Sequence, residues 1–377
     1  MTIWFIFGHE PWLLPPALEM VEALEDAGHR LYIFYIGDIP KEGDFQFEEF
    51  LRLPRQVGIK RLLMPFRLAS IISQATSRGV PDFILACDVL ALEALSYVTL
   101  PPAVRTGYWA FEVNEIPRRF RLSADYYRAL MFSRWISRLT LILAPSESRL
   151  AQLRRRCRKI GKSLIIFNSK RNGRRMMMPV AAVVDHAMNS CDIKLVSSGR
   201  IDYGHGLMEL VEALRLLPKN IGLFLAGGGN EEFRRRLQRR AEEIQVASRF
   251  LLLPRLTRAE NDFLLSRADI GVVIYEEAGC IARFDVAPNK LGDYVGGGLA
   301  IIGTDQPYLR HWVEGNGIGV CIGEATPECI CDAVECLLCG DRLVRAKEAA
   351  RDLYQSQLNM DVQMKKFVEL MEELRNR

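Results

Sequence analysis

The chain has 377 residues, of which 49% are hydrophobic and 25% charged, and its formal net charge is +4. This length exceeds one ordinary domain, and this composition excludes disordered and fibrous proteins. Apolar runs end before the ~20 residues that a membrane span needs, and the first residues lack the basic region and cleavage site of a secretory signal. We therefore expect a soluble, two-domain, cytoplasmic protein.

In the first half of the chain, runs typical of strands alternate with helical patterns. Strands are expected at 2–7, 31–37, 83–87, 104–112, 139–145 and 163–167. Between the first two, residues 15–28 carry apolar side chains at the helical period and end at a glycine. Nearly continuous Val, Ile and Leu strands alternating with amphipathic helices predict a parallel sheet covered on both faces.

The second half repeats this alternation after a seam of irregular period at 170–191. Strands are expected at 193–199, 221–227, 249–254, 269–275, 299–304 and 317–323. The sequence thus predicts an α/β protein with two Rossmann-like domains whose parallel sheets face a central cleft. The expected bounds are 1–175 for the N-terminal domain, 191–355 for the C-terminal domain and 356–377 for a terminal helix.

Charge is divided unevenly between the two halves. Residues 1–175 hold 26 Lys and Arg against 17 Asp and Glu, and residues 176–377 hold 24 against 29, so the halves carry +9 and −5. A basic half indicates an anionic partner. Cations at 51–67 and 118–138 alternate with Leu and aromatic residues, which predicts docking on an anionic membrane surface. The alternative is that these aromatic residues are core and the arginines a solvated face.

Two other sequence features exclude further classes of function. The basic half lacks a recognised nucleic-acid-binding module, so no nucleic-acid partner is expected. Nine cysteines make a poor disulfide framework and suit a reducing compartment. Those between 329 and 339 are spaced as one helix, so we expect buried structural thiols there rather than a zinc site.

Ligands of open parallel sheets bind beyond the carboxyl ends of the strands. Gly8 follows the first strand, where a glycine lets backbone amides approach an anion; the alternative is a simple turn. Gly199 ends the strand expected at 193–199 and Arg200 follows it, and this pair is a candidate diphosphate clamp. The glycines at 227–229 alone predict only a flexible turn.

The stretch 285–302 is the most informative part of the sequence. Pro288 suits the first position of a helix, which would leave the amides of Asn289 to Leu291 free for a phosphate. Asp293 lies one turn into that helix, where its carboxylate can accept both hydroxyls of a ribose, and Asp285 lies in the preceding loop. The alternative is a capped surface helix with two solvated acids.

This stretch resembles the signature of retaining GT-B glycosyltransferases, particularly of the family 4 type. In that family two glutamates are separated by seven residues around Pro-Asn-Lys-Leu-x-Glu-Tyr. Here Asp285 and Asp293 have that spacing, with Pro288 to Leu291 and Tyr294 in place. Residues 198–200, 225–229 and 267–270 resemble the same family, and 107–112 and 144–148 do so more loosely.

The resemblance implies roles for individual residues. Asp293 would hold the ribose, Asp285 would position the donor sugar, Arg200 would bind the phosphates and Gly8 would approach them from the other domain. Arg255 would lie beside the base. The implied nucleotide-sugar-binding residues are Gly8, Arg200, His205, Arg255, Asn289, Lys290, Leu291 and Asp293, and the implied catalytic residues are Asp285 and Glu112.

Three departures from the family pattern stand out. Both acids are Asp where Glu is usual, and His205-Gly206 stands where a Lys-Gly pair is usual. A histidine that many members carry in the N-terminal domain is not evident.

The function implied is transfer of a hexose from a nucleotide-diphosphate sugar, with retention, to a lipid-linked or saccharide acceptor. The pathway implied is assembly of a cell-surface polysaccharide or glycolipid, in the cytoplasm or peripherally on the inner face of the membrane. Because the chain has no Asp-x-Asp pair, Arg and helix N-termini must meet the diphosphate charge, and we expect neither a metal nor a cofactor besides the donor. The alternatives are a non-catalytic nucleotide-sugar-binding protein of the same fold and a nucleotide-sugar 2-epimerase.

Overall fold

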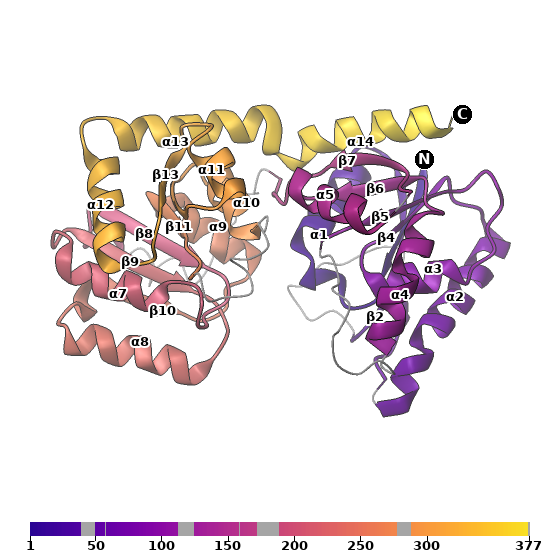
Figure 1. The fold of residues 1–377 in the computed structure, drawn as a ribbon, viewed down its shortest axis with the longest axis horizontal. Helices are drawn as coiled ribbons and strands as arrows, with labels where there is room; N and C mark the ends of the chain where they lie inside the picture. The colour runs from indigo at the N-terminus through magenta and orange to yellow at the C-terminus, as the bar shows by residue number, and fades with distance from the viewer. Residues whose placement is uncertain are drawn as a thin grey trace. The chain divides into compact units, whose positions relative to one another are not determined.

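The computed structural model describes residues 1–38, 50–56, 58–111, 124–157, 159–171, 188–276 and 288–375. The chain divides into two compact units, each with its own sheet and core (Figure 1). Unit 1 comprises Met1–Phe167 and Met360–Arg377, and unit 2 comprises Asn168–Asn359. The C-terminal segment is thus part of unit 1, although unit 2 precedes it in the sequence.

Unit 1 contains a seven-stranded parallel sheet of order β3-β2-β1-β4-β5-β6-β7. Its strands are β1 (Thr2–Phe7), β2 (Arg30–Ile36), β3 (Phe50–Leu53), β4 (Phe83–Ala86), β5 (Arg105–Trp109), β6 (Leu141–Ala144) and β7 (Lys162–Ile165). Its helices are η1 (Pro11–Leu13), α1 (Pro15–Asp26), η2 (Gly58–Leu63), α2 (Met64–Arg78), α3 (Val89–Ser96), α4 (Ala124–Ile136), α5 (Glu147–Arg156) and α14 (Met360–Arg375).

Strand β1 shows how the sheet of unit 1 is covered. Trp4 and Ile6 join a core with α2, α3, α4 and α5 on one face, while Ile3, Phe5 and Phe7 join a core with α1 and α14 on the other. A strand that is buried on both faces has no polar alternation. All six strands predicted in this half are present, but the sequence pattern missed β3, a four-residue edge strand that contains Arg52.

Helix α14 is fixed to unit 1 by polar contacts as well as by its apolar face. The side chain of Gln363 accepts a hydrogen bond from the amide of Phe167 (2.6 Å) and donates to its carbonyl (3.2 Å). Arg105 Nε donates to the carbonyl of Leu374 (2.9 Å). Because these bonds pair buried backbone groups, they fix the register of the helix on the sheet.

Unit 2 contains a six-stranded parallel sheet of order β10-β9-β8-β11-β12-β13. Its strands are β8 (Ile193–Ser198), β9 (Ile221–Ala226), β10 (Phe250–Leu253), β11 (Ile270–Val273), β12 (Ala300–Thr304) and β13 (Gly319–Ile322). Its helices are α7 (Leu207–Leu216), α8 (Glu231–Glu243), η3 (Ala247–Arg249), α9 (Arg258–Arg267), α10 (Asn289–Gly296), α11 (Pro307–Val313), α12 (Pro327–Leu338), α13 (Arg342–Leu353) and a π-helical turn, η5 (Tyr354–Leu358).

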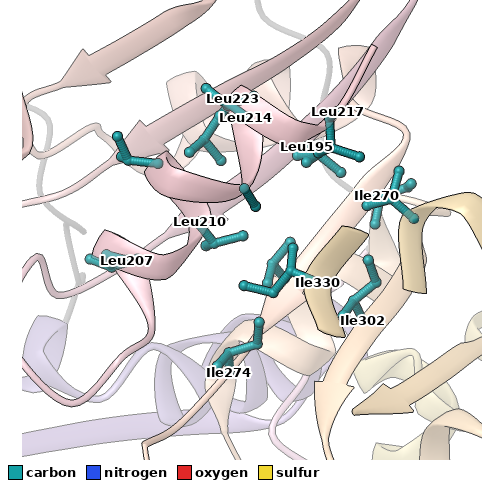
Figure 2. Packing of buried hydrophobic residues seen from close by; sticks show 14 of the residues in the cluster. Leu195, Leu207, Leu210, Leu214, Leu217, Leu223, Ile270, Ile274, Ile302 and Ile330 are labelled. Carbon is teal, nitrogen blue, oxygen red and sulfur yellow. The ribbon is translucent and has the colours of Figure 1, made fainter. Parts of the chain in front are cut away.

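One core of unit 2 lies between its sheet and the helices α7, α8 and α12. Figure 2 shows Leu214 of α7 beside Leu223 of β9; Leu210, Leu195 and Ile270 belong to the same cluster. The predicted α/β class with two parallel sheets is confirmed, since every strand pair in both sheets is parallel.

The helix predicted from the cysteine spacing is present as α12, but its thiols are not all buried. Cys331 is buried in the core, Cys329 and Cys336 are half-buried, and Cys339 is exposed after the helix. The expectation of uniformly buried thiols was therefore wrong, because these positions follow the edge of the apolar face rather than its centre.

Within the described ranges, no helix has both the length and the hydropathy needed to cross a bilayer.

Candidate functional site

At the carboxyl end of the unit 2 sheet, the chain segments after β8 and β9 continue side by side. Ile201 and Gly229 form an isolated parallel bridge, and the amide of Gly199 donates to the carbonyl of Ala226 (2.8 Å). A Cβ on Gly227 would lie 1.6 Å from the carbonyl oxygen of Gly199. Gly227 and Gly229, whose Cβ would lie 2.1 Å from the carbonyl oxygen of Ile201, are therefore needed for close backbone packing, a more specific role than the flexible turn predicted from sequence.

Lys290 lies on the first turn of α10 and reaches the end of β8. Its ammonium group donates to the hydroxyl of Ser197 (3.3 Å), and a Cβ on Gly199 would lie 2.8 Å from its Cε. Burial lowers the pKa of Lys290 to about 8. Among the residues that the structure describes, no carboxylate forms an ion pair with Lys290. This partly buried cation is therefore suited to an added anion.

Arg200 is exposed and already paired within its own loop. Its Nε and Nη2 donate to one oxygen of Asp202, at 2.9 and 2.7 Å, and this contact lowers the pKa of Asp202. A phosphate bound by Arg200 has to share the guanidinium with Asp202 or displace it. Arg255 is also exposed, in the loop after β10.

His205 differs from the lysine that the family pattern has there in charge as well as in shape. Burial, followed by the positive charge of Lys290, lowers its pKa to about 4, with Asp202 opposing the shift and Arg200 adding to it. The imidazole is therefore neutral at pH 7. Its Nδ1 is buried and has no hydrogen-bond partner among the described residues, so it can supply a hydrogen bond to a ligand but no charge.

Glu276, which sequence reasoning missed, organises the turn before α7. Its Oε1 accepts from the amides of Gly204 (3.2 Å) and Gly206 (3.4 Å), and its own amide donates to the carbonyl of Gly204 (3.2 Å). Gly206 is the N-cap of α7, with a φ of 60°. Exposed amides at a helix N-terminus favour an anion, and here a side-chain carboxylate supplies it. Nothing in the sequence distinguishes this residue from the adjacent Glu277.

Helix α10 is held close to the sheet by small residues and by Tyr294. The amide of Ser198 donates to the Tyr294 hydroxyl (2.8 Å), and a Cβ on Gly271 would lie 2.4 Å from the Tyr294 ring. A Cβ on Gly292 would lie 1.9 Å from the carbonyl oxygen of Asn168. These contacts fix the position of α10 relative to β8 and thereby place Lys290 beside Ser197.

The N-terminus of α10 differs in detail from the prediction. Pro288 is the N-cap rather than the first helical residue, and its carbonyl accepts a hydrogen bond from the amide of Leu291 (3.2 Å). The expectation that all three amides of Asn289 to Leu291 are free was therefore wrong, since a closed first turn uses the third. Leu291 is buried in the core and Asn289 is exposed.

Asp293 lies on α10 beside a charged cluster from other elements. Burial raises its pKa to about 6; the positive charges of Lys170 and Arg258 oppose the shift, and Asp262 adds to it. The ammonium group of Lys170 forms an ion pair with Asp262. Asp293 is thus a partly desolvated carboxylate without a dedicated ion pair in the described ranges, which suits recognition of neutral hydroxyls.

In unit 1, Gly8 contacts a carboxylate. Its amide donates to Oδ2 of Asp88 (2.5 Å), whose Oδ1 caps α3 by accepting from Ala91 (2.9 Å). A Cβ on Gly8 would lie 2.5 Å from Asp88. His9 Nε2 lies 3.6 Å from the same carboxylate, so this strand end carries a His–Asp pair that the sequence did not reveal.

The two residues predicted to be catalytic, Asp285 and Glu112, lie outside the described residues. In the part of the chain that the structure describes, no group of three or more His, Cys, Asp or Glu residues is arranged to hold a metal ion.

Solved structures of other proteins are similar to this chain over nearly its whole length. No protein-family model matches the chain, and no curated protein sequence matches it. The sucrose-phosphate synthase of Thermosynechococcus elongatus is 17% identical, with 99% of each chain covered and a TM-score of 0.73. The chain has the GT-B fold.

Two further GT-B structures cover nearly the whole chain. Anabaena HepE, solved in complex with UDP and glucose, is 14% identical, with 99% of this chain and 100% of that chain covered and a TM-score of 0.72. WaaG, a glycosyltransferase involved in lipopolysaccharide biosynthesis, is 16% identical, with 97% and 98% covered and a TM-score of 0.64. The likeness therefore spans both units.

Proposed function

We propose that this GT-B protein is a glycosyltransferase that takes a hexose from a nucleotide-diphosphate sugar. The observation that carries the proposal is the arrangement at the end of β8, where Lys290 presents a partly buried cation beside Ser197 and α10 carries Asp293. A GT-B fold supports it, since HepE was solved with UDP-glucose. The family resemblance supports retention of configuration.

We assign the charges of the donor to residues of unit 2. Lys290 and Arg200 neutralise the diphosphate, His205 donates or accepts a hydrogen bond as a neutral imidazole, and Asp293 accepts from the ribose hydroxyls. Departure of a nucleoside diphosphate develops negative charge on the phosphates. Fixed cations in a partly desolvated site stabilise that charge more than water does, which lowers the barrier.

The remaining roles rest on the sequence resemblance. Asp285 positions the donor sugar, Glu112 acts beside it, and Arg255 lies beside the base. Asn289 and Leu291 belong to the first turn of α10, which we place next to the phosphates of the donor. Gly8 is the remaining residue that the resemblance assigns to donor binding. Because the cations present can meet the diphosphate charge, we propose that no metal is required; activity should persist in EDTA without added Mg²⁺ or Mn²⁺.

We propose a lipid-linked or saccharide acceptor, used in cell-surface polysaccharide or glycolipid assembly on the cytoplasmic face of a membrane. The basic first half of the chain favours an anionic surface near the acceptor. WaaG, which shares the fold, is described as acting in lipopolysaccharide biosynthesis.

A thermal-shift panel of UDP, GDP, ADP, TDP and their sugars tests donor binding. A ligand at ~100 times its dissociation constant adds about 2.7 kcal/mol to the stability of the folded protein, which such a panel detects. We expect one nucleotide diphosphate and its sugar to raise the melting temperature. No shift with any of them would overturn the proposal.

The second candidate is a non-catalytic nucleotide-sugar-binding protein, favoured by the two aspartates and by the neutral His205. Slow hydrolysis of the donor separates the two functions, because a binding protein releases no nucleoside diphosphate. Asp285→Asn should bind nucleotide nearly as the parent does and slow this release. An unchanged rate in that variant would remove Asp285 from the mechanism.

A further inference from the structure

Unit 1 exposes apolar side chains on neighbouring helices that its core does not use. Leu62 and Leu63 of η2 are 51% and 56% exposed, Phe66 of α2 is 51% exposed, and Tyr127 and Leu130 of α4 are 43% and 54% exposed. Single exposed apolar residues are ordinary, but a continuous patch of them marks an interaction surface.

Ring contacts make this patch continuous across three helices. The ring of Phe66 stacks on that of Tyr97, at the end of α3, with centroids 4.5 Å apart. The hydroxyls of Tyr97 and Tyr127 are 3.5 Å apart. Helix α3 packs against both α2 and α4 (Figure 1). We call this surface the α2–α4 face; its apolar members are Leu62, Leu63, Phe66, Tyr97, Tyr127 and Leu130.

The cations around this face are exposed and have no acidic counterparts along α2. From Phe50 to Pro81 the chain has six Lys or Arg and no Asp or Glu. Lys60 of η2 and Arg67, next to Phe66 in the sequence, are exposed, and Arg134 lies one turn beyond Leu130 on the same side of α4. The exposed acid of α4, Asp125, is paired with Arg128 (3.0 Å).

The structure corrects the composition of the surface predicted from sequence. Phe132 and Trp135 of α4 are buried in the core, so they cannot contact a partner. Arg128 is also largely buried, where it pairs with Glu93 (2.6 Å). The arginines at 118, 119 and 121 lie outside the described residues. The predicted second segment thus contributes Tyr127, Leu130 and Arg134 rather than its whole aromatic set.

We propose that the α2–α4 face binds a phospholipid surface of net negative charge. Aliphatic and aromatic side chains about half exposed can enter the headgroup region, while Lys and Arg on long stems reach the lipid phosphates. A surface of mixed apolar and basic residues, whose α2 segment carries no acid and whose exposed acid on α4 is paired with Arg128, complements such a bilayer in both respects. This inference does not rest on the transferase activity.

The core can tolerate changes to the exposed residues, which makes the proposal testable. Helix α2 packs on the sheet through Met64, Leu68 and Ile72, and substitutions on its outer face leave these residues unchanged. We therefore compare Leu62→Ser/Leu63→Ser/Phe66→Ser and Lys60→Glu/Arg67→Glu with the parent. The matched control is Arg235→Glu/Arg239→Glu on α8 of unit 2, two exposed arginines of an arginine-rich helix.

Co-sedimentation with vesicles of phosphatidylcholine, with and without about one third phosphatidylglycerol, measures binding. We expect the parent to bind the anionic vesicles at low salt and to be released at high salt, because counter-ions screen the phosphates. Each double or triple variant of the α2–α4 face should lower the partition coefficient by about tenfold or more. The double variant removes cations that attract the lipid phosphates, and the triple variant removes apolar side chains that enter the headgroup region. The α8 control should bind like the parent.

Three outcomes would overturn the proposal: no binding to anionic vesicles, binding unaffected by salt, or equal loss in the α8 control. A dimer in solution that the serine variant dissociates would assign the face to a second copy of the chain instead. Melting temperatures of all variants confirm that they fold. Donor binding by the same variants separates this result from the proposed function, since donor binding should be unchanged.

Discussion

In both units a glycine follows a central strand, Gly8 after β1 and Gly199 after β8, yet the groups beside these glycines carry opposite charge. Asp88, which follows the neighbouring strand β4, accepts from Gly8. Lys290, which follows the neighbouring strand β11, lies against Gly199. The strand order reverses at β1 in unit 1 and at β8 in unit 2, so each sheet has a ligand-binding position at the carboxyl end of that strand. The side chain that comes from the neighbouring chain segment decides which ligand charge this position accepts. In unit 2 the cation Lys290 favours a bound anion at this position, whereas in unit 1 the carboxylate of Asp88 already occupies it.

The largest effect on stability is expected from Gly227, where the backbone after β9 packs closely on the backbone after β8. Gly227→Ala should lower the free energy of unfolding by about 2–4 kcal/mol, because its Cβ would overlap the carbonyl of Gly199 and its φ is 150°. Gly228→Ala is the matched control, since the nearest side-chain atom to its Cβ lies at 3.8 Å. Denaturant unfolding of both variants checks this; equal stability would show that the glycines serve flexibility alone.

Asp293 should lose function and gain stability when it is neutralised. Asp293→Asn should weaken nucleotide affinity by about 1–3 kcal/mol, the range for charge-assisted hydrogen bonds, and raise the free energy of unfolding at pH 7 by about 1 kcal/mol. Calorimetric titration and chemical unfolding measure the two effects. A destabilised variant would mean that Asp293 serves the ion pair of Lys170 and Asp262 instead.

The raised pKa of Asp293 also predicts the direction of its pH dependence. Its pKa is about 6 in the folded chain and 3.8 ordinarily, so between these values the folded chain binds a proton that the unfolded chain does not. The contribution of Asp293 to stability therefore rises as pH falls from about 6 to about 4, while nucleotide affinity falls. Asp293→Asn should remove both slopes.

Lys290 should distinguish phosphates from the rest of the nucleotide. Lys290→Met should weaken binding of a nucleoside diphosphate by about 1–2 kcal/mol and leave nucleoside binding unchanged. Because the pKa of Lys290 is about 8, a bound anion should raise it, and the parent should take up protons on binding at pH 8. Titrations in buffers of different ionisation enthalpy detect this uptake, and its persistence in the variant would exclude Lys290 as its source.

His205 should have the smallest effect. Its imidazole is already neutral above pH 5, so replacing it by a neutral amide removes no charge. At each pH between 6 and 8, the nucleotide affinity of His205→Gln should therefore differ from that of the parent by less than about 0.5 kcal/mol. A pH-dependent loss in that range would mean that the bound ligand protonates the ring. This comparison tests whether Lys290, rather than the residue at the family's usual lysine position, supplies the charge.

The sequence alone determined the class of fold and most of the sheets. Twelve predicted strands are present, since buried parallel strands are apolar runs of distinctive length between helical patterns. The unpredicted strand, β3, is a short edge strand with one apolar face, and such a segment looks like a loop. The apolar positions of α12 predicted the helix, but burial of each cysteine depended on what packs beside it.

Only the tertiary structure decided the chemistry at the strand ends. The carboxylate of Glu276 and the turn at Gly204 are 72 residues apart in the sequence, and no local pattern links them. The spacing of Lys290 and Asp293 identified α10, but their pKa values depend on burial and on side chains from other elements. Periodicity records which face of an element is apolar, whereas the protonation and partners of a polar group depend on distances across the fold.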